Sequence, residues 1–258
     1  MRTLAHKVSG IWATVNGAIL FYTRIPLPHR WPAKFARIAL IVPWVGVGLG
    51  VLLSGLDRLM GTLGLSLELG SALVVLTGVW LTGGLHLDGA MDTGDGLAVQ
   101  DDQQRLVAMA DSRTGAFGVM VGVAILLLKT IAFAGITHHR WFALISATAW
   151  GRWGQQWAIG RYAYLKPEGK GAFHKQAIPS CWQALPAALG LVGLTGIAMT
   201  LGWIRWPSGL MAVGLGLGHA YVLAGWLNRR IGGHTGDTYG AMVEWGEVAV
   251  LVGLAAVN

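Results

Sequence analysis

Cysteine and charge are what this chain has least of. Its one cysteine, Cys181, excludes an internal disulfide and any metal site built from several cysteines. Charged residues make up only 12% of the 258 residues, whereas they make up about 25% of an ordinary soluble domain. The scarcity of charge therefore argues against a soluble globular protein.

Apolar residues take the place of the missing charge. They make up 54% of the chain and recur in long uncharged runs, which are typical of membrane-spanning helices. The 39 glycines and 13 tryptophans fit this class, because glycine lets helices pack closely and tryptophan anchors them at membrane interfaces. The sequence predicts an all-α, polytopic integral membrane helical bundle. With no internal repeat or separate soluble stretch, residues 1–258 are expected to form a single domain.

Eight apolar segments predict a bundle of about seven to eight helices. The first is short for a span, so it either crosses obliquely or lies in the membrane interface. The segments lie at about 8–22, 35–56, 67–87, 117–136, 141–160, 182–203, 208–227 and 242–257.

The basic residues predict how this bundle is oriented. Alternation of the segments places the connection 24–37, the acidic stretch after residue 87, and the connections 161–179 and 228–241 on one side. Lys and Arg gather there, which identifies that side as cytoplasmic. The protein is therefore expected to cross the membrane several times with these loops on the cytoplasmic side. Its net charge of +7 lies in loops, which suits anionic lipids or phosphate ligands rather than nucleic acid.

Three aspartates follow the third apolar segment at helical spacing. Asp88, Asp92 and Asp95 fall at i, i+4 and i+7, which places them on one face of a helix. Like charges this close repel unless a cation lies between them, and carboxylates suit Mg²⁺. We predict that these three residues are catalytic and hold the metal, with His86 as a further ligand or a base. The alternatives are a solvated acidic loop and a histidine that only forms interfacial hydrogen bonds.

A second group of polar residues is suited to binding phosphate. Arg113 can grip a phosphate with its planar guanidinium, and Gly115 lets backbone N–H groups approach it closely. Asp111 and Ser112 immediately precede the arginine. The alternative is a simple ion pair between Asp111 and Arg113 within the loop.

A glycine-rich stretch near the end of the chain forms the third group. Flanked by arginines, it could cradle a phosphate, although glycine-rich loops also serve as plain turns. If the last helix begins early enough, three carboxylates beyond the glycines share one of its faces. The candidate substrate-binding residues here are Gly232, Gly233, Thr235, Gly236, Asp237, Glu244 and Glu247. Lys129 and Arg152 lie within apolar segments and are expected to face the bundle interior.

Together these motifs resemble the cobalamin synthase family of adenosylcobinamide-GDP ribazoletransferases. The resemblance is carried, in chain order, by residues 21–26, the acidic stretch 83–97, residues 111–118, residues 151–153, and residues 232–247. It therefore covers most of the chain.

The resemblance implies a Mg²⁺-dependent enzyme of the bacterial inner membrane that acts late in vitamin B12 synthesis. Such an enzyme joins adenosylcobinamide-GDP to α-ribazole, or to α-ribazole 5′-phosphate, and releases GMP. For this chemistry Arg24, Arg113 and Arg152 are candidate substrate contacts, and Asp95 or His86 would accept the proton of the attacking hydroxyl. Two alternatives are a membrane phosphotransferase of the CDP-alcohol type and an ion-coupled transporter. The sequence does not exclude a homo-oligomer.

Overall fold

The computed structural model describes residues 2–166 and 171–257. The regular secondary structure of this part is helical, apart from one isolated bridge between Tyr164 and His234. In chain order the helices are α1 (Arg2–Tyr22), η1 (Ile38–Leu40), α2 (Val42–Thr62), α3 (Leu67–Leu81), α4 (Leu85–Ala98), α5 (Asp102–Ala108), α6 (Ala116–Gly135), α7 (Arg140–Arg161), α8 (Ala172–Ala177), η2 (Cys181–Ala184), α9 (Leu185–Thr200), α10 (Trp206–Ile231) and α11 (Gly236–Ala256). The predicted all-α class is confirmed.

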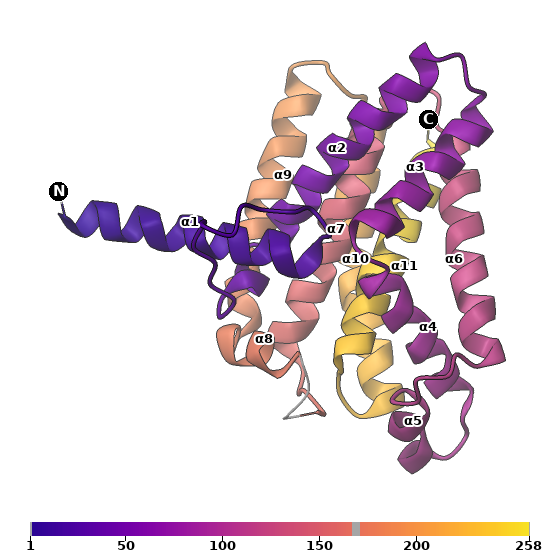
Figure 1. The fold of residues 1–258 in the computed structure, drawn as a ribbon. Helices are drawn as coiled ribbons and strands as arrows, with labels where there is room; N and C mark the ends of the chain where they lie inside the picture. Colours follow the sequence, from indigo (N-terminus) through magenta and orange to yellow (C-terminus); the bar gives the residue numbers. More distant parts are fainter. Residues whose placement is uncertain (1, 167–170, 258) are drawn as a thin grey trace.

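Most of the long helices run side by side in one bundle (Figure 1). Five segments of the described chain are long and apolar enough to cross a membrane: α2, α6, η2 with α9, α10, and α11. The bent pair of α3 and α4 counts as a sixth span if it is taken as one. The bundle therefore confirms a polytopic membrane protein, and the expected count of seven to eight segments holds only approximately.

Two helices account for the difference in count. Helix α7 lies within the bundle and packs on α2, α10 and α11, but its lower half carries Arg152, Gln155 and Gln156 and is too polar to count as a lipid-facing span. Helix α1 lies across the direction of the bundle and extends away from it (Figure 1). Its apolar part, Gly10–Tyr22, is shorter than a span. Of the two predicted arrangements for the first segment, this orientation matches the interfacial one.

The predicted pairing of the loops agrees with the architecture for three of the four connections, whereas the connection 24–37 runs beside α1 (Figure 1). The connections that follow α4, precede α6, follow α7 and join α10 to α11 all lie at the lower end of the bundle in Figure 1. The short connections after α2, α6 and α9 lie at the upper end, near the carboxyl terminus. The loops with conspicuous chemistry therefore share one end of the molecule.

Several helix boundaries differ from the predicted ones, among them the start of α2, the end of α3 and the start of α11. The predicted segment 35–56 begins at Val42, where Pro43 occupies the first turn of α2, a position that proline tolerates. The predicted segment 67–87 breaks after Leu81. The last helix begins at Gly236 rather than near 242, because Thr235 and Thr238 form a reciprocal capping box.

Candidate active site

The site begins at a sharp break between α3 and α4. The two helices meet at 89°, with Gly83 and Gly84 in the left-handed backbone region at φ +64° and +73°. Glycine adopts this conformation without the steric penalty of a side chain. The break directs α4 toward the lower end of the bundle and places His86 in its first turn.

Close packing of α4 against α11 brings acidic residues from distant parts of the sequence together. A Cβ atom on Gly89 would lie 2.8 Å from the backbone oxygen of Asp237, and one on Gly240 would lie 2.7 Å from that of His86. Only residues without side chains allow two helices to approach this closely. The contact places Asp237 beside the acidic row of α4, which consists of Asp88, Asp92 and Asp95.

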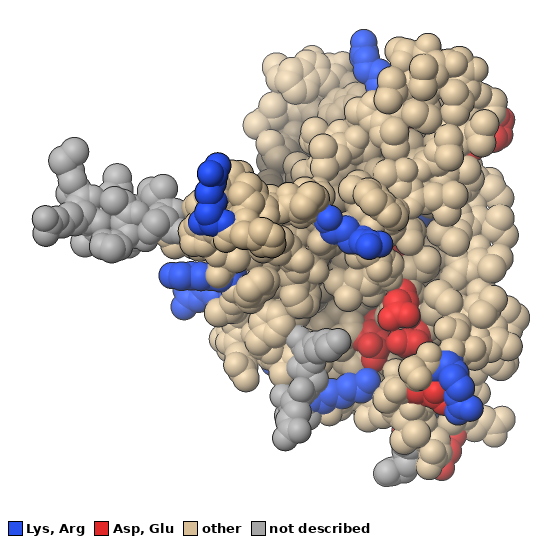
Figure 2. Space-filling view, viewed as in Figure 1, with Lys and Arg blue, Asp and Glu red and all other residues tan. Residues whose placement is uncertain are grey.

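The aspartates of α4 lie on one helix, as predicted, and they crowd one another. Asp92 is half-buried and repelled by the charges of Asp88, Asp95 and Asp237, while Lys166 attracts it. The ammonium group of Lys166 pairs with Asp237 at 3.1 Å. In Figure 2 acidic side chains form one patch over α4, with Lys and Arg side chains around it. Such crowding of like charges favours a bound cation.

The carboxylate of Asp95 accepts two backbone hydrogen bonds that the sequence did not predict. The backbone N–H groups of Gly115 and Gly118, at the start of α6, each donate to its carboxylate at 2.7 Å. A carboxylate at a helix amino terminus satisfies N–H groups that have no partner within the helix. Asp95 therefore joins the acidic row to α6, and a side chain at Gly118 would clash with it.

No three histidine, cysteine or acidic side chains within the described ranges converge closely enough to hold a metal ion by themselves. Mg²⁺, however, is commonly bound by one or two carboxylates, with water and substrate phosphate completing its octahedral shell. The neighbouring carboxylates of Asp88 and Asp92 fit that pattern.

A polar cavity of about 350 Å³ opens beside the acidic row. It lies between the end of α1, the first turns of α4, the middle of α7, the region of α8 and the start of α11. Its lining includes Tyr22, His86, Asp88, Gln155, His174, Gly236, Asp237 and Tyr239.

The cavity wall carries several buried polar atoms without a hydrogen-bond partner among the described residues. They are Nδ1 and Nε2 of His86, Oε1 of Gln155, Nδ1 of His174 and the hydroxyl of Tyr239. Burial lowers the pKa of His174 to about 4, so its ring is neutral at pH 7, and its Nε2 lies 3.4 Å from the hydroxyl of Tyr22. Buried polar groups are normally paired, so these atoms make the cavity a candidate binding site.

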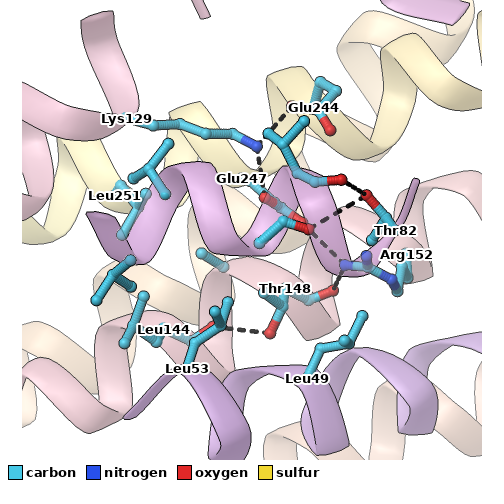
Figure 3. A pocket seen from close by; sticks show the side chains of 15 residues that line it. Leu49, Leu53, Thr82, Lys129, Leu144, Thr148, Arg152, Glu244, Glu247 and Leu251 are labelled. Carbon is cyan, nitrogen blue, oxygen red and sulfur yellow. Dashed lines mark hydrogen bonds and ion pairs between the residues drawn. The ribbon is translucent and has the colours of Figure 1, made fainter. Parts of the chain in front are cut away.

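Four buried charges form a separate cluster deeper in the bundle (Figure 3). The ammonium group of Lys129 lies 2.6 Å from a carboxylate oxygen of both Glu244 and Glu247. Arg152 contacts the other oxygen of Glu247 at 2.8 Å and the backbone oxygen of Thr148 at 2.9 Å. The cluster lines an interior cavity of about 40 Å³ rather than the polar cavity. Of the acidic residues predicted on α11, only Asp237 therefore reaches the polar cavity.

The glycine-rich stretch 232–236 forms mainly a turn. Gly232 ends α10 in the left-handed region at φ +88°, and Gly233 packs against Leu165. His234 exchanges backbone hydrogen bonds with Ala163 and Leu165 at 2.9 and 2.8 Å. Thr235 caps α11, so in this stretch Gly236 alone lines the polar cavity.

The exposed arginines among the predicted site residues, Arg113 and Arg24, occupy different settings. Arg113 forms the loop ion pair with Asp111 at 2.7 Å, and these hydrogen bonds lower the pKa of Asp111 to about 2. The Arg113 side chain is 88% exposed, so it remains accessible to a ligand. Arg24 is exposed and packs along Gly83 at the α3–α4 break, near the acidic row.

Sequence reasoning missed several residues of the cavity wall: Tyr22, Gln155, His174 and Tyr239. The polar residues of the fifth apolar segment, which include Gln155, were a usable signal, because polar residues within a span usually face the protein interior. The others lie in ordinary aromatic and loop contexts. Only the convergence of residues from α1, α4, α8 and α11 on one cavity identifies them.

Comparison with known proteins gives a consistent result. Residues 14–255 match the family model described as cobalamin-5-phosphate synthase. The chain is 52% identical over 238 residues to the adenosylcobinamide-GDP ribazoletransferase of Trichormus variabilis, covering 91% of this chain and 93% of the relative. It is 47% identical to the enzyme of that name from Synechococcus sp., over 94% and 96% of the two chains, and 46% identical to that from Synechocystis sp., over 95% of each. No solved structure matches it significantly.

Proposed function

Because this chain belongs to the cobalamin-5-phosphate synthase family, we propose that it is an adenosylcobinamide-GDP ribazoletransferase. A ribose hydroxyl of α-ribazole, or of its 5′-phosphate, attacks the phosphorus that links cobinamide to GMP. A new phosphorus–oxygen bond forms, the bond to GMP breaks, and the hydroxyl proton passes to a base. We place this reaction on the cytoplasmic side of a bacterial inner membrane, where the basic loops gather.

The observation that carries this proposal is the polar cavity beside the crowded carboxylates of α4 and α11. Phosphoryl transfer needs positioning and charge neutralisation more than covalent chemistry by the protein. The cavity can position an acceptor, and the acidic row can hold the ion that neutralises phosphate. An ion-coupled transporter would need a pathway through the bundle, and the interior charge cluster is instead paired within itself.

Mg²⁺ is the proposed cofactor, and the donor set fits it. Asp88 and Asp92 would hold the ion, with Asp237 close enough to orient its water or a second ion. When bound, Mg²⁺ supplies positive charge to the phosphate oxygens and the departing GMP. The exposed Arg24 and Arg113 would add cationic contacts to the diphosphate.

The structure favours His86 over Asp95 as the group that accepts the hydroxyl proton. Asp95 already accepts two backbone hydrogen bonds, whereas neither ring nitrogen of His86 has a partner within the described chain. His86 faces the same cavity as Asp88, so a hydroxyl held there would lie between the base and the phosphate. The first requirement for a general base is that it lies within hydrogen-bond reach of the proton that it accepts, and its pKa is the second.

The direct test uses the purified protein in nanodiscs with Mg²⁺, adenosylcobinamide-GDP and α-ribazole. We expect release of GMP together with a corrinoid that carries the ribazole, and no GMP when α-ribazole is omitted. Transfer to another alcohol from a CDP-linked donor, with no reaction of adenosylcobinamide-GDP, would refute the proposal in favour of a CDP-alcohol phosphotransferase.

A further inference from the structure

The polar cavity has the properties of a binding site for one small polar molecule. His86, Gln155, His174 and Tyr239 line it, and each has a buried polar atom without a partner among the residues that the structure describes. None of the four is more than 3% exposed. Four buried groups left unsatisfied would be unusual in a cavity with no ligand. We infer that this cavity binds the base and ribose of the acceptor nucleoside. The inference rests on the proposed function and names the substrate of this cavity.

The shape and chemistry of the wall suit a ribosylated benzimidazole. Phe21, Tyr22 and Leu85 supply apolar surface, and the Tyr22 ring lies nearly parallel to those of His86 and His174, at 17° and 14°. Aromatic surface suits the planar base, and the polar atoms suit the ribose hydroxyls and the ring nitrogen. At about 350 Å³ the cavity lies in the size range of small-molecule sites and is too small for a corrinoid.

The in-line geometry of the reaction decides whether the acceptor or the guanine nucleotide occupies the polar cavity. His86 lies in the first turn of α4, and Asp95 lies nine residues further along the same helix, where it contacts the start of α6. Helix geometry therefore separates the two residues by about 14 Å along the axis of α4. Asp88 and Asp92 lie between these ends. In-line displacement places the nucleophile and the leaving group on opposite sides of phosphorus. With the base His86 at one end, the acceptor occupies the cavity and GMP departs toward Gly115.

Two conservative substitutions test this assignment. Gln155→Met and Tyr239→Phe each remove one unpartnered polar group and keep the size of the side chain. The Phe at 239 also keeps the ring contacts with Tyr164 and His234 at 5.8 and 5.7 Å. Loss of one hydrogen bond in a buried site is expected to raise KM for α-ribazole about fivefold to tenfold. KM for adenosylcobinamide-GDP and the inhibition constant of GMP should stay unchanged.

Matched controls make the outcome specific. Gln183→Met and Tyr221→Phe change the same residue types at exposed positions outside the cavity and should leave both KM values unchanged. A rise in the inhibition constant of GMP or in KM for the donor would assign the cavity to the nucleotide and overturn the inference. Unchanged kinetics in Tyr239→Phe would also overturn it, even if Gln155→Met fails to fold. Wild-type protein that releases no GMP refutes the proposed function instead.

Discussion

The buried charge cluster makes a quantitative prediction about stability. Lys129, Arg152, Glu244 and Glu247 join α6, α7 and α11, and their side chains are only 2–13% exposed. Two positive and two negative charges balance. Removing one partner of a buried pair leaves an uncompensated charge and typically costs about 3–5 kcal/mol. We therefore expect Lys129→Met and Glu244→Gln each to destabilise the protein by about 3–5 kcal/mol.

The double variant separates charge balance from simple loss of contacts. Lys129→Met with Glu244→Gln leaves the pair of Arg152 and Glu247, which is neutral in itself. The double variant should therefore be more stable than the sum of the single effects predicts, by about 2 kcal/mol or more, since contacting charged residues couple strongly. Unfolding in mixed detergent, followed by tryptophan fluorescence, measures all four proteins. Additive effects within about 0.5 kcal/mol would show that charge balance does not govern this cluster.

Three further predictions concern the acidic row and the orientation. Asp92→Asn should lower activity by orders of magnitude and shift the rate to higher Mg²⁺, because one anionic ligand is lost; normal metal dependence in initial-rate assays would exclude Asp92 as a ligand. Asp95→Asn should instead destabilise the protein by about 2 kcal/mol in the same unfolding assay, because an amide cannot accept both N–H groups of α6, and the Mg²⁺ concentration for half-maximal rate should not move. In a Cys181→Ser background, a cysteine at Gln176 should resist an impermeant thiol reagent in intact cells while one at Trp203 reacts; equal labelling would contradict the orientation.

Patterns that depend on local sequence predicted a large part of the architecture. Segments 117–136 and 141–160 match α6 and α7 to within one residue at each end. Alternation of the apolar segments predicted which connections share an end, because each span reverses the direction of the chain. The spacing of Asp88, Asp92 and Asp95 predicted one helix, and α4 includes all three.

Pairings across long sequence separations could not be predicted in the same way. Lys129 and Glu247 are 118 residues apart, and each had several possible partners until the helices were placed. The sequence indicated that Lys129 and Arg152 face the interior, but not that Glu244 and Glu247 neutralise them. The contact of Asp95 with the start of α6 was not predicted for the same reason, because the sequence alone does not distinguish a carboxylate that binds a metal from one that caps a helix.

The α3–α4 break explains why motifs far apart in the sequence act as one unit. Helix carbonyls freed at membrane depth need partners, and irregular backbone is tolerated there only where protein covers it. Here the backbone N–H of Arg24 donates to the carbonyl of Leu81 at 2.7 Å, and the Arg24 side chain covers Gly83. The segment that follows α1 therefore completes the end of α3. Because α4 starts from this break, the stretch 21–26 helps to position His86 and the acidic row, whatever contact the Arg24 guanidinium itself makes with phosphate.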